Sequence, residues 1–158
     1  MSSTWGEKIK ISIFGGSHTA AIGIVIDGLP AGETVDMDAV LVQMARRAPG
    51  QDKTATTRRE SDTPQILSGL LDGVLTGAPL CAVIQNTSQH SKDYSGLKIT
   101  PRPGHADYTF DQKYGFRDYR GGGRSSGRET IGRVAAGAVA LKILKSLHVQ
   151  LTTYSSSI

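Results

Sequence analysis

The order of apolar and polar residues along the chain predicts several short strands. In Lys8–Phe14, three isoleucines alternate with polar side chains, and this period of two predicts a half-exposed strand. The apolar segment Ala21–Ile26 predicts a second strand, and the short glycine-containing loop between the two predicts an antiparallel pair. Further strands are predicted over Ile66–Leu71 and Leu80–Ile84.

Two helices are predicted from the spacing of apolar residues and from their end signals. Asp36 can cap a helix that extends to about Arg47, where a Pro-Gly pair follows. Ser126 and Glu129 have the S-x-x-E spacing of a capping box, which predicts that a second helix opens at Ser126. The apolar stripe of this second helix continues through about Leu147.

The remaining segments are predicted to be loops within one domain. The polar residues 51–62 predict a mobile loop, and residues 86–103 are mostly loop as well. Gly132 and Gly137 lie inside the second helix and predict close packing against another backbone. No repeat or linker divides the chain, so residues 1–158 are predicted to form a single domain.

The composition is that of a globular protein in a reducing compartment. Hydrophobic residues make up 38% of the 158 residues and charged residues 20%. No apolar run approaches the roughly 20 residues that cross a membrane, and the first residues lack the apolar core of a signal peptide. The single cysteine, Cys81, excludes an internal disulfide. We therefore expect a cytoplasmic protein with no membrane partner.

Charge is concentrated between Pro101 and Thr130. This run carries six basic and four acidic side chains, half of the formal net charge of +4, together with six glycines. Glycine N–H groups and a helix N-terminus both favour an anion, and Arg124 and Arg128 can grip phosphate or carboxylate as forks. The run predicts a site for a phosphorylated or carboxylated small molecule. A flexible surface turn is the alternative that the local pattern leaves open.

Two histidines stand in loops of small residues. His18 follows the first predicted strand, and His105 lies between Gly104 and Ala106. Each histidine taken alone is more often a surface residue, but beside an anion loop the two suit general acid chemistry. The sequence contains no HExxH motif and no paired cysteines, so no metal site is predicted.

Four longer motifs resemble those of one enzyme family. They are FGGSHTAAIGIVIDGLPAG, RRAPGQ, RPGHADYTFDQKYG and RDYRGGGRSSGRETIGRVAAGAVA, and they follow the family's order over nearly the whole chain. On these motifs the chain resembles chorismate synthase. The resemblance implies an α+β fold, a β-α-β sandwich with helices between antiparallel sheets, of which this chain holds an incomplete part. It also implies a homotetramer.

The resemblance further implies the chemistry. The family eliminates phosphate from 5-enolpyruvylshikimate 3-phosphate in a 1,4 sense to give chorismate, a step of the shikimate pathway. It requires reduced FMN, and the resemblance leaves open whether NADPH reduces that flavin on the same protein. The implied partners are a small anionic substrate and further copies of the chain, with no nucleic acid and no membrane.

Position in the motifs implies roles for individual residues. His18 matches the histidine that assists departure of the phosphate, and His105 matches the histidine that protonates the flavin. The positions that match substrate contacts are Ser17, Arg47, Lys53, Arg102 and Arg128. The positions that match flavin contacts are Arg124, Ser125 and Ser126.

The chain departs from the family pattern at several positions. Gly16 stands where the family has glutamate and Thr19 where it has glycine, and both changes bear on the placement of His18. Ala48 and Gly127 replace an arginine and an alanine of the family motifs. At position 53 many members have arginine, so the lysine keeps the charge without the planar fork.

Length is the largest departure. Family members are substantially longer, and much of their flavin site and a catalytic aspartate belong to their second half. We therefore expect an N-terminal fragment or a disrupted chain rather than a self-sufficient enzyme. Two alternatives stay open: a non-catalytic remnant that binds anions or self-associates, and a nucleic-acid binder that uses the RGGGR segment with steep salt dependence.

Overall fold

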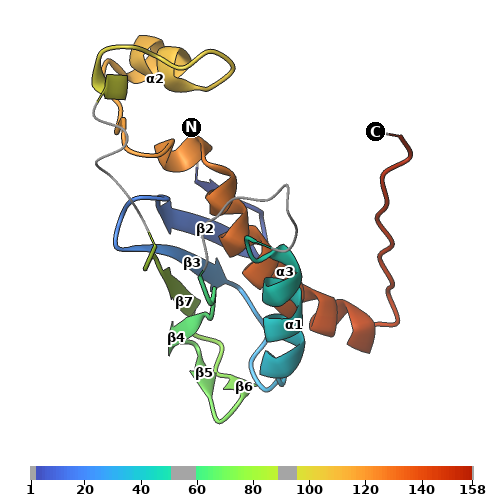
Figure 1. The fold of residues 1–158 in the computed structure, drawn as a ribbon. Coiled ribbons are helices and arrows are strands. Elements are labelled where there is room, and N and C mark those ends of the chain that lie inside the picture. Colours follow the sequence, from blue (N-terminus) through green and yellow to red (C-terminus); the bar gives the residue numbers. More distant parts are fainter. Residues whose placement is uncertain (1–2, 51–59, 89–95, 158) are drawn as a thin grey trace.

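The centre of the fold is one antiparallel sheet. The computed structural model of the chain describes residues 3–50, 60–88 and 96–157. Five strands form the sheet in the order β1-β2-β3-β7-β4 (Figure 1). Their bounds are Thr4–Trp5 for β1, Lys10–Gly15 for β2, Ala21–Asp27 for β3, Leu80–Gln85 for β7 and Gln65–Ser68 for β4.

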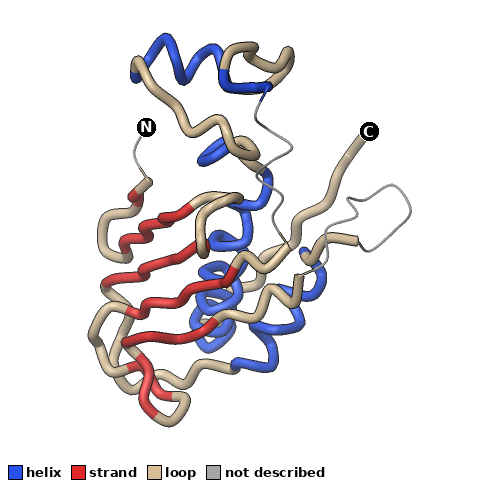
Figure 2. The backbone as a smooth tube through the Cα atoms, turned by 60° about the vertical axis from the view of Figure 1, so that its left-hand side comes forward, coloured by secondary structure: helices blue, strands red, loops and turns tan. Residues whose placement is uncertain are grey.

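Two helices cover one face of this sheet. Helices α1 (Met37–Arg47) and α3 (Thr130–Ser146) pack against each other, and α3 contacts β2 and β3 (Figure 2). Strands β5 (Leu70–Leu71) and β6 (Val74–Leu75) form a separate hairpin. In the described ranges, no helix combines the length and apolar character that crossing a bilayer requires.

A third helix lies beyond one end of the sheet. Helix α2 (Asp107–Tyr114) is separated from the sheet in both views, and the chain returns from it to the start of α3 (Figures 1 and 2). Two 3₁₀ turns, Gly123–Ser125 and Gly127–Glu129, form this return. The return places the glycine-rich run of the sequence next to the ends of β2 and β3.

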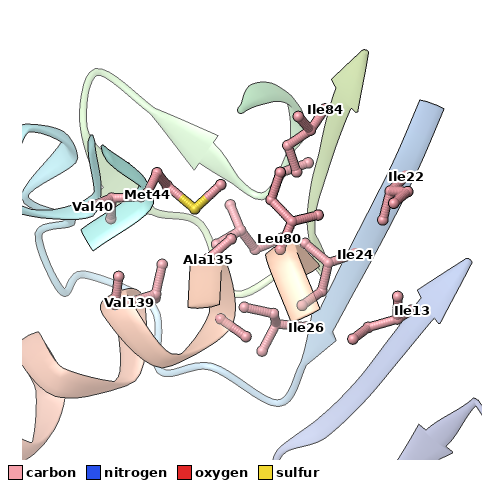
Figure 3. Close-up of a cluster of buried hydrophobic side chains, with 14 of the residues drawn as sticks. Ile13, Ile22, Ile24, Ile26, Val40, Met44, Leu80, Ile84, Ala135 and Val139 are labelled. Carbon is pink, nitrogen blue, oxygen red and sulfur yellow. The ribbon is translucent and has the colours of Figure 1, made fainter. Parts of the chain in front are cut away.

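The hydrophobic core lies between the sheet and the helix pair (Figure 3). Alternate residues of β3 point into it, because successive side chains of a strand face opposite sides. Ile22, Ile24 and Ile26 are at most 3% exposed. Their register partners Ile84, Ala82 and Leu80 on β7 share the same face. The helices close the core with Val40, Met44, Ile131, Ala135 and Val139.

The structure confirms most of the predicted elements. The α+β class is confirmed, with helices packed on an antiparallel sheet. β2 and β3 pair antiparallel, from Lys10 opposite Asp27 to Gly15 opposite Ile22. Asp36 caps α1 as predicted, since its Oδ1 accepts a hydrogen bond of 2.9 Å from the N–H of Ala39.

The predicted start of the second helix was wrong by four residues. Ser126 caps the 3₁₀ turn Gly127–Glu129 by accepting from the N–H of Arg128, and α3 begins at Thr130. The Glu129 carboxylate does not complete a capping box: the N–H of Ser126 donates to the carbonyl of Gly123 at 3.4 Å, and Oε2 of Glu129 pairs with Arg124. The ion pair therefore replaces the expected reciprocal cap.

Three further predictions need correction. The strand expected over Ile66–Leu71 is divided at Gly69, which has a φ of +83° and where a Cβ would lie 2.5 Å from Cα of Leu80. The predicted mobile loop lies mostly outside the described residues; at its described end Ser61 is exposed, but Asp62 is buried, with 1% of its surface exposed. Helix α2 was not predicted; Asp107 is its only buried residue, so it lacks the apolar stripe by which helices are found.

The two glycines inside α3 differ in their surroundings, and neither faces the backbone of another element. We expect Gly137→Ala to stabilise the chain by up to about 1 kcal/mol, because its Cβ would meet no described atom within 4 Å. Gly132→Ala brings the same gain in helix propensity. Its Cβ, however, would lie 3.2 Å from Cδ1 and Cγ1 of Ile13, so crowding offsets this gain. Urea unfolding of the two variants measures the difference. Equal stabilisation by both would contradict the close approach of α3 to β2.

Candidate functional site

His18 lies in the loop that joins β2 to β3. Thr19 closes this loop: its Oγ1 accepts from the N–H of Gly16 at 2.9 Å and donates to the carbonyl of Ala21 at 2.8 Å. The neighbouring Ser17 is 2% exposed, and its Oγ lies 3.0 Å from Nδ1 of His18. The threonine that departs from the family pattern thus orders the loop, and Ser17 orients the imidazole.

The glycine-rich run packs directly on His18. Gly121 has a φ of +68°, and a Cβ at this position would lie 1.8 Å from Nδ1 of His18 and 2.7 Å from Oγ of Ser17. Only a residue without a side chain fits against the ring at this distance. The structure therefore brings together two motifs that lie about a hundred residues apart in the sequence.

A bidentate ion pair fixes the loop that carries His105. Arg102 donates from Nε to Oδ2 of Asp107 at 2.8 Å and from Nη2 to Oδ1 at 2.9 Å, and its backbone N–H donates to Oδ2 at 3.0 Å. Both Nη atoms lie 3.4 Å from the carbonyl oxygen of Gly121. Arg102 thus connects the start of α2 to the glycine that contacts His18.

The hydrogen bonds from Arg102 hold the pKa of the Asp107 carboxyl well below its usual range. The unfolded chain has an Asp pKa of about 3.9, and a lower pKa in the folded state stabilises the fold at any pH above that value. This stabilisation decreases as the pH falls from about 4 toward the folded-state pKa. We expect Asp107→Asn to cost about 1–3 kcal/mol at pH 7 and progressively less below about pH 4. Urea unfolding at pH 7 and pH 3 measures the two values. An equal cost at both would contradict the ion pair.

A pocket of about 230 Å³ opens beside the His18 loop. Its wall combines glycine backbone, aromatic rings and arginine, from the residues Gly15, Gly16, Thr19, Ala106, Asp107, Phe110, Phe116, Arg117, Asp118, Gly122, Gly123, Arg124 and Ser125. Arg124 pairs with Oε2 of Glu129 at 2.5 Å and donates to Oγ of Ser3 at 2.9 Å. Burial raises the pKa of the Glu129 carboxyl, and the Arg124 guanidinium opposes that rise.

Two arginines predicted as substrate contacts share one carboxylate. Nη1 of Arg47 lies 2.9 Å from Oδ2 of Asp62, and Nη1 of Arg128 lies 2.9 Å from Oδ1 of the same side chain. Arg128 is 6% exposed, whereas the side chain of Arg47 keeps 19% of its surface. The structure therefore places Arg47 at the edge of a buried cluster and Arg128 inside it.

The other predicted residues have different surroundings. His105 is exposed, and its backbone N–H donates to the carbonyl of Arg102 at 3.3 Å. Ser125 lines the pocket, while the hydroxyl of Ser126 is used in the cap of the 3₁₀ turn. Lys53 lies outside the described residues. Across the described ranges, no three His, Cys, Asp or Glu side chains are placed to hold a metal ion.

Several residues of this region were not found from the sequence. Asp62 and Glu60 belong to a polar segment that was interpreted as a mobile loop, and Asn86 was assigned to a loop. The sequence does contain a signal at Asn86, because this polar residue directly follows the apolar strand β7. In the structure it is 9% exposed. A polar residue at the end of a buried strand must find partners, so its position could have indicated a structural role.

Comparisons with known proteins agree on one family. The family model described as "Chorismate synthase" matches residues 9–158. The chain is similar to the chorismate synthase of Agathobacter rectalis, with 53% identity over 99% of this chain and 42% of that protein. It is also similar to that of Cytophaga hutchinsonii, with 49% identity over the whole chain and 44% of that protein.

A solved structure supports the fold independently. The structure titled "Crystal Structure of Chorismate Synthase" superposes with a TM-score of 0.62 at 24% identity. The superposition covers 90% of this chain and 36% of the solved chain. The chain thus spans less than half the length of the curated relatives that it matches.

Proposed function

Because the chain belongs to the chorismate synthase family, we propose that it supplies part of the active site for phosphate elimination from 5-enolpyruvylshikimate 3-phosphate. The reaction class is that of a lyase. The observation that carries the proposal is the contact of Gly121 with His18 and Ser17, which brings the FGGSHT and RGGGRSS segments together at one place. Arg102, bound to Asp107, supports the same contact from the third motif.

The pocket beside the His18 loop fits a flavin in its chemistry. Phe110 and Phe116 offer apolar surface for an aromatic ring system, and Gly122 and Gly123 allow close approach of the backbone. Arg124 adds a positive charge for a phosphate. Reduced FMN bound there would supply electron density to the substrate. We propose that Arg124, Ser125 and Ser126 hold part of it.

The remaining residues bind the substrate anion and move protons. His18 donates a proton to the departing phosphate, with its ring orientation set by Ser17 and Gly121. Arg47 and Lys53 are proposed to contact the substrate's anionic groups, and Arg102 to do so while it holds Asp107. The predicted contact of Arg128 with substrate stays a prediction, since its guanidinium faces two carboxylates.

His105 is proposed to protonate the flavin. We expect His105→Ala, in a full-length form that carries these residues, to lower kcat by about 10²–10⁴-fold while substrate binding changes little. His105 is exposed and takes no structural hydrogen bond through its ring in the described residues, so the chain should fold as before. Stopped-flow turnover and equilibrium binding separate the two effects. Unchanged turnover would remove this role from His105.

Chorismate formation with reduced FMN tests the proposed function. We expect a full-length form to show activity and the 158-residue chain alone to show far less, because the chain spans less than half of its curated relatives. Normal activity of the 158-residue chain would overturn the proposal that it supplies only part of the site. Absence of flavin and substrate binding, together with defined self-association, would favour a non-catalytic remnant.

Other properties of the family extend the proposal. We propose that residues 1–158 fold as a single domain, the N-terminal portion of the family's β-α-β sandwich. The complete protein is proposed to be a cytoplasmic homotetramer whose substrate is a small anion, and NADPH is one candidate source of reducing equivalents for the flavin. Analytical ultracentrifugation and a flavin-reduction assay with NADPH test the last two statements.

A further inference from the structure

A buried polar cluster lies directly beneath the His18 loop. We call it the Arg128 cluster, and it consists of Glu60, Asp62, Asn86 and Arg128. The guanidinium of Arg128 contacts Oε2 of Glu60 at 2.5 Å, Oδ1 of Asp62 at 2.9 Å and Oδ1 of Asn86 at 2.7 Å. The side chains of Glu60, Asp62 and Arg128 are at most 5% exposed.

Asn86 connects this cluster to the loop that carries His18. Its Nδ2 donates to the carbonyl of Gly16 at 2.9 Å and to the carbonyl of Thr19 at 2.8 Å. These two carbonyls flank Ser17 and His18 in the sequence. Both N–H donors and the carbonyl oxygen of the amide are therefore used, two on the loop and one on Arg128.

The rest of the cluster fixes Asn86 itself. Oε1 of Glu60 accepts from the N–H groups of Thr87 and Ser88 at 2.8 and 2.9 Å, so the backbone that follows Asn86 is also held. Asp62 adopts a φ of +52°, an uncommon conformation for a residue other than glycine. Such a conformation persists where surrounding contacts impose it, here the ion pairs to Arg47 and Arg128.

We propose that Asn86 is a positioning residue for His18, and that the Arg128 cluster acts on the site through this amide. The role of His18 rests on the proposed function, but its placement by Asn86 does not. The amide joins both ends of the loop between β2 and β3, so the backbone of Ser17 and His18 cannot move away from Gly121 without breaking two hydrogen bonds, one buried and one partly buried.

Asn86→Asp tests the proposal with a matched control. The carboxylate keeps an acceptor for Arg128 but loses both donors to the loop. Gln85→Glu is the same amide-to-carboxylate change one residue earlier, at an exposed side chain. The readouts are the Cε1–H and Cδ2–H signals of His18 in NMR spectra of the 158-residue chain, and the rate of its modification by diethyl pyrocarbonate.

We expect the His18 signals to shift in Asn86→Asp and the modification rate to rise about threefold or more, with neither change in Gln85→Glu. A folded Asn86→Asp chain with unchanged His18 signals and rate would overturn the proposal. Asn86→Ala removes the donors without adding a charge and serves if the aspartate variant does not fold. In the unmodified chain, rapid solvent exchange of the Asn86 side-chain amide protons would by itself contradict the proposal.

Turnover gives a separate measurement. In an active full-length form, we expect Asn86→Asp to lower kcat by about tenfold or more while KM stays close to its original value, because misplacement of a reacting group costs mainly turnover. Displacement of His18 in the NMR spectra without any chorismate synthase activity in the unsubstituted form would count against the proposed function alone. Activity with an undisturbed His18 in the variant would count against the positioning role alone.

Discussion

Gly121→Ala is expected to abolish most turnover while leaving the chain folded. The new Cβ would lie 1.8 Å from Nδ1 and 2.2 Å from Cε1 of His18, distances at which two atoms cannot coexist. Because the imidazole is a side chain that can rotate, it moves before the backbone does. We expect kcat to fall about 10²-fold or more in a full-length form, as for other misplaced catalytic groups.

Gly115→Ala provides the matched control. Gly115 ends α2 with a φ of +70°, close to the +68° of Gly121, but a Cβ there would meet no described atom within 4 Å. Both variants therefore carry the same cost of about 1–2 kcal/mol for placing alanine in a left-handed conformation. Only Gly121→Ala should also shift the NMR signals of His18 and lose turnover. Equal turnover in the two variants would show that the glycine run does not position His18.

Strands β2, β3 and β7 and helix α1 could be predicted because their signals are local, whereas the two-residue strands β1 and β6 were not predicted. The alternation in Lys8–Phe14 and the apolar segment Ala21–Ile26 each mark a strand, and the side chain of Asp36 caps a helix within three residues of itself. The start of α3 could not be predicted from the same kind of signal. Glu129 satisfies the capping-box pattern in the sequence, yet Oε2 of its carboxylate pairs with Arg124, and the N–H of Ser126 that it would cap donates to Gly123.

The site could be predicted only in part, for a related reason. The motifs assigned His18 and the glycine-rich run to one site, but the sequence alone does not state that Gly121 of this run packs on His18. The contacts of Asn86 are harder still to predict from the sequence. Its partners Arg128 and Gly16 are separated from it by 42 and 70 positions in the chain. Polar residues that only position a reacting side chain take no part in the reaction themselves. Composition and motif spacing therefore do not reveal them.

Arg128→Met is expected to destabilise the chain more than any other single change considered for this site. It leaves the carboxylates of Glu60 and Asp62, whose side chains are at most 1% exposed, without their main counter-charge. Removing one partner of a buried ion pair typically costs about 3–5 kcal/mol. Arg120→Met is the control, because Arg120 pairs with Asp118 where both side chains are more than a third exposed, and exposed ion pairs contribute little to stability.

A combined substitution distinguishes the loss of charge balance from the loss of packing. In the Arg128→Met background, Glu60→Gln and Asp62→Asn neutralise the two carboxylates, and we expect at least about 2 kcal/mol of stability to return. Urea unfolding at pH 7 measures each step.

If Arg128→Met is no less stable than Arg120→Met, the cluster does not hold the fold together. If Arg128→Met is as unstable as expected, a loss of turnover in this variant has two causes that turnover alone does not separate. One is displacement of Asn86 and His18, and the other is loss of a contact between Arg128 and the substrate. A role for Arg128 in binding substrate then requires direct measurement of substrate affinity in a variant that remains folded.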